Sequence, residues 1–124
     1  MIFGIGVDII EVSRLDKEAK ISDNFFSRVF TEKEIEYCES KKFSAQHYAG
    51  RFAAKEAFFK ALGTGLRDGL TWKDVELTND ELGKPSLCFS GRAKEIIKEK
   101  NIKNAQVSLS HIKKLAKAFV ILET

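Results

Sequence analysis

The sequence has only two cysteines and no long apolar run, and both absences limit what the protein can be. Cys38 and Cys88 lack the spacing of a metal site or of a CxxC redox motif, so we interpret them as reduced residues of the core or its boundary. No stretch approaches the roughly 20 apolar residues that a membrane span needs. The N-terminal apolar run lacks a basic lead-in and is interrupted by Asp8, which argues against a secretory signal. We therefore expect a cytoplasmic protein that does not enter a membrane.

Motifs that bind nucleotides or nucleic acids are also missing. Gly4 and Gly6 are not followed by the third glycine of a dinucleotide fingerprint, and residues 63–69 lack the Gly-Lys-Ser/Thr ending of a P-loop. The ten phenylalanines do not form an RNA-binding strand, and core packing explains them. The net charge of +3 is mild. We expect no nucleic-acid partner, while some of the basic residues remain available for an anionic cofactor or an acidic protein.

What the chain does have is enough apolar sequence for one domain. At 124 residues and 44% hydrophobic residues, it is long enough to bury about two thirds of its unfolded surface. It contains no repeat, low-complexity segment or linker, so we expect a single domain over residues 1–124.

The pattern of elements favours an α+β domain over a doubly wound one. Thr31 and Glu34 form a capping-box pattern, and Gly63 is a plausible helix stop. The expected elements are a strand over residues 2–10, helices over 13–20, 31–41 and 44–62, strands over 75–78 and 86–89 flanking a loop, a helix over 91–100, and strands over 105–111 and 116–123.

Asp8 lies inside an apolar run, where a charged side chain is unexpected. On a strand over residues 2–10, alternation places Asp8 on one face with Gly4 and Gly6, and the large apolar residues between them on the other. Glycine inside a strand often marks a place where a ligand or another backbone comes close. The Asp8 face is therefore expected to have a close neighbour.

Glu56 has a similar setting on the expected helix over residues 44–62. It belongs to one helical stripe with Tyr48, Phe52 and Phe59, which is otherwise aromatic. Lys60 follows Glu56 by four residues and projects from nearly the same face. This spacing places a cation within reach of whatever the acid holds.

Each acid also has a purely structural interpretation. Glu56 and Lys60 match an exposed helix-stabilising pair, which contributes only about 0.2–0.5 kcal/mol, and Asp8 can end a strand and bond to a turn. An ionised carboxylate removed from water costs several kcal/mol unless it is paired, hydrogen-bonded or bound to a metal. The coincidence of two such acids in one small domain therefore indicates a cation site and a metal-assisted enzyme.

Four segments closely resemble the bacterial holo-acyl-carrier-protein synthases, which are the small phosphopantetheinyl transferases. The segment Arg-Phe-Ala-Ala-Lys-Glu-Ala at residues 51–57 is the most specific. The resemblance covers nearly the whole chain and implies the fold of that family, one compact α+β domain with an antiparallel sheet packed with helices. The four segments, in the order and at distances like those of the family, are residues 4–15, 50–65, 83–85 and 107–111.

The resemblance implies a reaction that fits the two acids. The family transfers the 4′-phosphopantetheine arm of coenzyme A to a serine of an apo acyl carrier protein, for fatty acid biosynthesis, and releases adenosine 3′,5′-bisphosphate. It implies that Asp8 and Glu56 hold Mg²⁺ together with pyrophosphate oxygens and water, an arrangement that this hard cation prefers. Lys60 is then a catalytic cation beside the pyrophosphate. Glu56 or a metal-bound water can accept the serine proton, and position alone does not choose between them.

The resemblance also implies a coenzyme groove. Arg51, Lys84 and Pro85 match positions that line it, and His111 matches a histidine near the phosphorylated ribose. Taken without the resemblance, Gly-Lys-Pro is only a turn, and a single histidine at a strand end is often structural.

A partner surface and an assembly follow from the same resemblance. Arg14, Phe25 and Arg28 match the basic and apolar surface on which the family docks the acidic helix of the carrier protein, while Glu18 and Asp23 place acids where relatives are often basic. Relatives form homotrimers with the coenzyme between neighbouring subunits, so we expect a homotrimer with sites at its subunit interfaces.

A binding module that holds a nucleotide or RNA phosphate through Mg²⁺, without chemistry, is the alternative. It predicts that phosphate binding survives loss of Asp8 or Glu56, whereas the enzyme needs both. The sequence leaves open which carrier proteins and acylated coenzymes are accepted, and whether Mn²⁺ replaces Mg²⁺.

Overall fold

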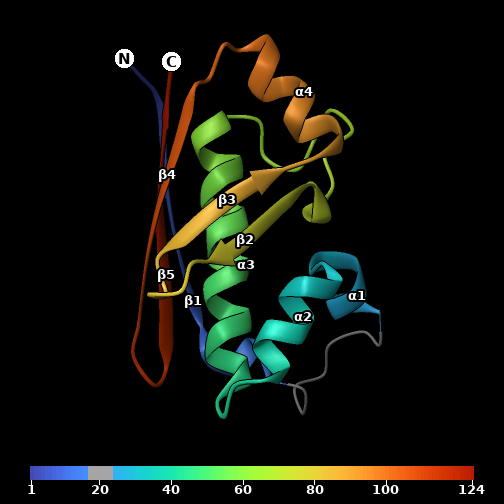
Figure 1. Ribbon diagram of the computed structural model, residues 1–124, viewed down its shortest axis with the longest axis vertical. Helices are drawn as coiled ribbons and strands as arrows, with labels where there is room; N and C mark the ends of the chain where they lie inside the picture. Colours follow the sequence, from blue (N-terminus) through green and yellow to red (C-terminus); the bar gives the residue numbers. More distant parts are fainter. Residues whose placement is uncertain (17–23) are drawn as a thin grey trace.

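The longest helix, α3 (Ser44–Leu62), runs through the middle of the molecule and is buried on almost every side (Figure 1). The structure is a computed structural model that describes residues 1–16 and 24–124. Alanine and phenylalanine supply most of the buried positions of α3, so neighbours approach it closely on several faces. The helix ends where Gly63 adopts a left-handed conformation, φ 82°, which glycine reaches without steric cost. The predicted glycine stop is confirmed.

A three-stranded antiparallel sheet covers one side of α3 (Figure 1). Its order is β1 (Ile2–Glu11), β5 (Leu115–Glu123) and β4 (Asn104–His111), so β1 and β4 form its two edges. The ends of the chain lie side by side, where the Thr124 N–H donates to the Met1 carbonyl at 2.8 Å. The sheet places the N-terminal strand and the C-terminal hairpin together against one helix.

The remaining elements surround the other sides of α3. The strands β2 (Val75–Asn79) and β3 (Pro85–Phe89) form the predicted hairpin, and α4 (Gly91–Glu99) connects it to the main sheet. The short helix α1 (Phe25–Val29) and α2 (Glu32–Glu39) lie toward the beginning of α3 (Figure 1). The Thr31–Glu34 capping box that opens α2 is present, as predicted. The whole is a single α+β domain with antiparallel sheets, as expected.

The helix predicted over residues 13–20 is wrong where the structure describes it. A 3₁₀ turn, η1 (Val12–Leu15), follows β1, and Asp16 after it is extended. Residues 17–20 of that prediction lie outside the described residues, as do Glu18 and Asp23. The sequence reading also missed α1 and the 3₁₀ turn η2 (Trp72–Asp74), because both are too short to carry a helical period.

The two glycines of β1 let α3 lie against the strand. A Cβ atom on Gly4 would lie 2.0 Å from the carbonyl oxygen of Ala61, and one on Gly6 would lie 1.9 Å from that of Ala57. Real carbon atoms do not approach an oxygen so closely, so only glycine fits at either position. The close neighbour predicted for the Asp8 face is therefore the backbone of α3.

An ion pair inside the core ties α3 to α2 and β2. Lys55 Nζ lies 2.8 Å from Glu34 Oε1, and both side chains are fully buried. Lys55 also donates to the carbonyl oxygens of Trp72 and Val75, and Glu34 Oε2 accepts from the Leu77 N–H. These bonds partner both charges, which burial requires.

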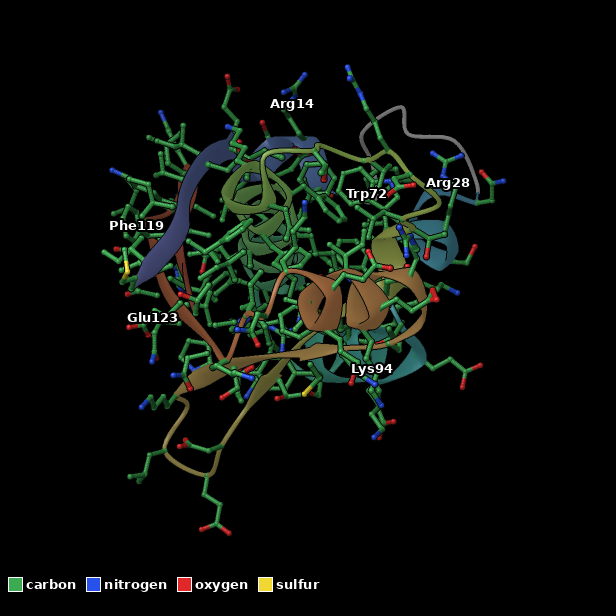
Figure 2. The ribbon with its side chains drawn as sticks, turned by 90° about the horizontal axis from the view of Figure 1, so that it is seen from above. Arg14, Arg28, Trp72, Lys94, Phe119 and Glu123 are labelled. Atoms are coloured by element: carbon green, nitrogen blue, oxygen red, sulfur yellow. The ribbon has the colours of Figure 1, made fainter. Side chains whose placement is uncertain are left out.

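The face of the sheet that turns away from α3 is apolar and exposed along β1 and the adjacent part of β5, whereas β4 presents the polar residues Gln106, Ser108 and Ser110 there. Figure 2 shows Phe119 on this outer side, and Phe119 is exposed. The alternation predicted for β1 is confirmed, because the large apolar residues that alternate with Gly4, Gly6 and Asp8 along the strand lie on this face. The exposed apolar residues of β1 on this face are Phe3, Ile5, Val7 and Ile9. No helix formed by the described residues is both long and apolar enough to span a bilayer.

Candidate functional site

Asp8, Glu56 and Lys60 come together where β1 meets the C-terminal half of α3. Lys60 Nζ lies 3.1 Å from Asp8 Oδ1 and donates to the Val7 carbonyl oxygen at 3.0 Å. Asp8 lies within β1 rather than at its end, so the interpretation of Asp8 as a strand-ending turn residue is wrong. Lys60 forms its ion pair with Asp8, which is distant in the sequence, rather than with Glu56 on its own helix. A shallow hollow of about 350 Å³ opens beside Asp8 and Lys60.

The charge of Glu56 is disfavoured in this arrangement. Partial burial raises the pKa of its carboxyl, the negative charge of Asp8 raises it further, and Lys60 lowers it. The carboxylates of Asp8 and Glu56 thus lie near each other, and the Lys60 ammonium forms its ion pair with Asp8. A divalent cation between Asp8 and Glu56 removes their repulsion, so the donor set fits a metal ion.

The number of protein ligands restricts which ion fits. Within residues 1–16 and 24–124, no group of three or more histidine, cysteine, aspartate or glutamate side chains is arranged to hold a metal. Two carboxylates suit Mg²⁺, which binds through one or two carboxylates and completes its octahedron with water and phosphate oxygens. A closed zinc site needs more protein ligands than this site offers.

A second cavity of about 430 Å³ lies between the first half of α3, the β2–β3 turn and β4. Its wall includes Arg51, Lys84, Pro85 and His111, so the structure gathers in one pocket all four residues that the family resemblance assigns to the coenzyme groove. Lys84 and His111 are exposed, Pro85 is partly buried and Arg51 is buried.

Arg51 has the features of an anion-binding residue. Its guanidinium donates to Asn79 Oδ1 at 2.7 Å and lies 4.1 Å from the centre of the Tyr37 ring. The buried Nε atom of Arg51 makes no hydrogen bond to any described residue. A buried donor without a partner costs about 1–3 kcal/mol, which an anionic ligand in the cavity can offset.

The two parts of the site lie at opposite edges of the main sheet. Asp8 on β1 and Leu109 on β4 both pair with Ala118 of the central strand. Adjacent strands are about 4.8 Å apart, so the two edges are separated by about 10 Å at this level, and α3 covers the face between them. On one chain, the acids and the basic cavity therefore do not form a single pocket.

Three residues were matched to a partner surface. Arg14 precedes residues 17–23, which lie outside the described residues, and Phe25 and Arg28 follow them. Figure 2 shows Arg14 and Arg28 at the rim, with side chains directed away from the body, from η1 and α1. Phe25 is partly buried, and its ring packs against Phe30 and Phe52. Both arginine side chains are directed outward, where a partner can contact them, whereas Phe25 mainly joins α1 to the core.

Sequence reasoning missed several residues of the basic cavity. His47 precedes Arg51 by four residues on α3, and this helical spacing was a usable signal. Tyr37 and Asn79 reach the cavity only through the packing of α2 and β2 against α3, which no local pattern encodes.

Neither cysteine lies at a site: burial raises the pKa of the Cys38 thiol to about 12, and Cys88 is exposed and forms no disulfide.

The chain matches one protein family along most of its length. Residues 4–119 match the 4′-phosphopantetheinyl transferase superfamily. A protein of Geobacter sp. (strain M21), named holo-[acyl-carrier-protein] synthase, is 56% identical over 124 residues that cover 99% of each chain.

Solved structures agree with this match. The crystal structure of holo-[acyl-carrier-protein] synthase from Neisseria meningitidis has a TM-score of 0.91 and 33% identity, and the match covers 100% of both chains. The enzyme from Bacillus anthracis, in complex with CoA (3′,5′-ADP), has a TM-score of 0.82 and 40% identity, covering 100% of this chain and 98% of that one.

Proposed function

The chain belongs to the 4′-phosphopantetheinyl transferase superfamily, and from this premise we propose how its residues carry out the reaction of a holo-acyl-carrier-protein synthase. It transfers 4′-phosphopantetheine from coenzyme A to a serine of apo acyl carrier protein and releases adenosine 3′,5′-bisphosphate. We further assign this reaction to fatty acid biosynthesis in the cytoplasm.

The observation that carries the residue assignment is the meeting of Asp8, Glu56 and Lys60 at the junction of β1 and α3. Asp8 and Glu56 would hold Mg²⁺ through their carboxylate oxygens, with the pyrophosphate of coenzyme A supplying further oxygens. When bound, Mg²⁺ supplies positive charge against the negative charge that grows on the pyrophosphate oxygens during phosphoryl transfer.

Each protein residue then has a defined task. Lys60 stays anchored to Asp8 and Val7 and directs the rest of its charge at the pyrophosphate, where it stabilises the departing phosphate. The proton of the attacking serine hydroxyl passes to Glu56 or to a water held beside it, the two acceptors that the position of the site allows. The serine oxygen forms a bond to the phosphorus nearest the pantetheine as the bond from that phosphorus to the bridging oxygen breaks.

The basic cavity binds the adenosine end of coenzyme A in this proposal. The guanidinium of Arg51 and the exposed ammonium of Lys84 would supply positive charge to an anionic ligand, and Pro85 and His111 complete the wall. The B. anthracis relative was crystallised with this coenzyme. Arg14 and Arg28, with the apolar edge of Phe25, would receive the acidic helix of the carrier protein, chiefly raising the rate of association.

We also propose a homotrimer with each site between two subunits. Its support is twofold: the acids and the cavity lie at opposite edges of the sheet, and the outer face of the sheet exposes apolar side chains along β1 and at Phe119 of β5. A neighbour that covers this surface can bring its basic cavity to the acids of the first chain.

Ile5→Lys places a charge at that surface without touching the core. The molar mass measured by light scattering should therefore fall from that of a trimer to that of a monomer, while the helical circular dichroism signal is retained. An unchanged mass would refute this interface.

The test of the function is intact-mass spectrometry of apo acyl carrier protein incubated with the protein, coenzyme A and Mg²⁺. A mass increase by one phosphopantetheine group, abolished by a chelator and by Asp8→Ala or Glu56→Ala, is expected. Lys98→Ala on α4 is a matched surface control and should leave the reaction intact. Transfer that survives loss of both acids would refute the assigned centre, and no transfer to a competent carrier would refute the function.

A further inference from the structure

The basic cavity contains a histidine that no part of the proposed reaction uses. His47 lies on α3, one helical turn before Arg51, and its ring centre is 6.0 Å from that of His111 on β4. No aspartate or glutamate is among the described residues that line the cavity, whereas Arg51 and Lys84 both are. The wall therefore combines two permanent cations with two imidazole rings.

The surroundings of His47 oppose its protonation when the cavity holds no ligand. Partial burial lowers the pKa of its imidazole, and the positive charges of Arg51, His111 and Lys41 lower it further. The groups nearest His47 are Arg51, one turn along the same helix, Tyr37 of α2, Lys41 of the α2–α3 turn and His111 of β4, and Lys84 of the β2–β3 turn lines the same cavity. None of them is an acid, so no partner compensates a positive charge on the ring.

A phosphate group in the cavity reverses this balance. A phosphate monoester carries nearly two negative charges at neutral pH, and each of these charges favours the cationic form of an imidazole within a few ångströms. The two rings lie next to each other in the cavity wall, so one phosphate group in the cavity can approach both. Binding and protonation are then linked, because a group that gains charge only in the complex takes up a proton as the complex forms.

We propose that His47, whose ring lies beside that of His111 in the cavity wall, takes up a proton when the phosphate monoester of the coenzyme's adenosine end enters the cavity. Affinity for that end of the coenzyme then increases as pH falls from about 8.5 to 6.5, a window set by the ordinary pKa of histidine and by the phosphate. This inference rests on the proposed placement of coenzyme A in the basic cavity. It adds a binding residue, His47, and a pH dependence to that site.

Titration calorimetry with adenosine 3′,5′-bisphosphate tests the proposal directly. At pH 7.5, the measured heat is compared between buffers of different ionisation enthalpy, and the slope gives the number of protons taken up. We expect about half a proton or more per site for the unchanged protein. His47→Gln should reduce this uptake at least by half, because it keeps a polar side chain and removes the titrating group.

The affinity itself provides a second readout. Between pH 8.5 and 6.5, binding of the bisphosphate should strengthen about tenfold in the unchanged protein and about threefold or less in His47→Gln. Gln46→Ala, the neighbouring position in the same wall, is the matched control and should keep the full pH dependence. Adenosine, which lacks the phosphates, should bind without proton uptake.

The outcomes separate this inference from the proposed function. Equal uptake in the unchanged protein and His47→Gln overturns the inference, as does failure of the bisphosphate to bind a protein that transfers phosphopantetheine. Uptake that depends on His47 supports the inference even if no carrier protein is modified, and that result would overturn only the transferase assignment.

Discussion

Lys60 Nζ lies 3.1 Å from Asp8 Oδ1, and this contact joins the end of α3 to the first strand across 52 residues of sequence. The Lys60 side chain is 53% exposed. An ion pair with one such exposed partner contributes only about 0–1 kcal/mol to stability. The contact therefore matters less for holding the fold than for fixing an ammonium beside two carboxylates.

Lys60→Met should reduce kcat/KM for transfer by about 10- to 100-fold, which is the usual range for loss of one charge-stabilising group. The unfolding midpoint should change little because the Lys60 side chain is largely exposed. Lys98 occupies the equivalent last turn of α4, so Lys98→Met is the control and should retain full activity. Equal losses in both variants would assign the effect to general surface charge instead of the Asp8 contact.

Glu56→Gln should raise the melting temperature by a few degrees at neutral pH without Mg²⁺. Burial and Asp8 raise the pKa of Glu56 in the folded state. The contribution of the Glu56 carboxyl to the free energy of unfolding is therefore most favourable below its unfolded-state pKa, and it is lost as pH rises through its folded-state pKa. At pH 7, glutamine carries no charge, so Glu56→Gln removes the cost of keeping an ionised carboxylate partly buried beside Asp8.

Addition of Mg²⁺ reverses the comparison. The ion should stabilise the unchanged protein in proportion to its occupancy and should have much less effect on Glu56→Gln. Thermal scans across pH 5–8, with and without Mg²⁺, measure both effects. A Glu56→Gln protein that is less stable than the parent without Mg²⁺ would contradict the raised pKa.

Much of this site follows from local patterns in the sequence. Alternation along residues 2–10 predicted which face Asp8 shares with Gly4 and Gly6, and helical spacing predicted that Lys60 lies beside Glu56. Each of these relations depends on a period of two or on i, i+4 spacing. They remained accurate because the elements that carry them are long and regular.

Other features depend on contacts between distant segments and could not be predicted in the same way. The pairing of Lys60 with Asp8 requires the distance between β1 and α3, and the cavity around Arg51 requires α2, the β2–β3 turn and β4 to meet. The helix expected over residues 13–20 is a 3₁₀ turn through Leu15 where the structure describes it, because Val12 and Leu15 pack into the core at a spacing of three. Such packing overrides local propensity.

Lys55→Met should destabilise the protein by about 3–5 kcal/mol, because it leaves Glu34 as a buried charge without its partner. The double variant Lys55→Met with Glu34→Gln should lose less than the sum of the two single changes, since neither charge remains. Urea unfolding measures all three. A loss below about 1 kcal/mol for Lys55→Met would show that the pair is dispensable, and Lys60→Met serves as the exposed-lysine control.

Gly6→Ala tests whether close packing of β1 on α3 sets the position of Asp8. The new Cβ would lie 1.9 Å from the Ala57 carbonyl oxygen, so the strand or the helix must shift. Overpacking of this kind costs about 1–3 kcal/mol, and a displacement of about 1 Å at Asp8 can reduce transfer by about 100-fold. Gly63→Ala is the matched control, because Gly63 has φ 82° and open space around it; it should cost about 1 kcal/mol of stability and leave activity nearly intact. Equal activity losses in the two variants, measured at a temperature where both are folded, would mean that β1 packing does not position the acids.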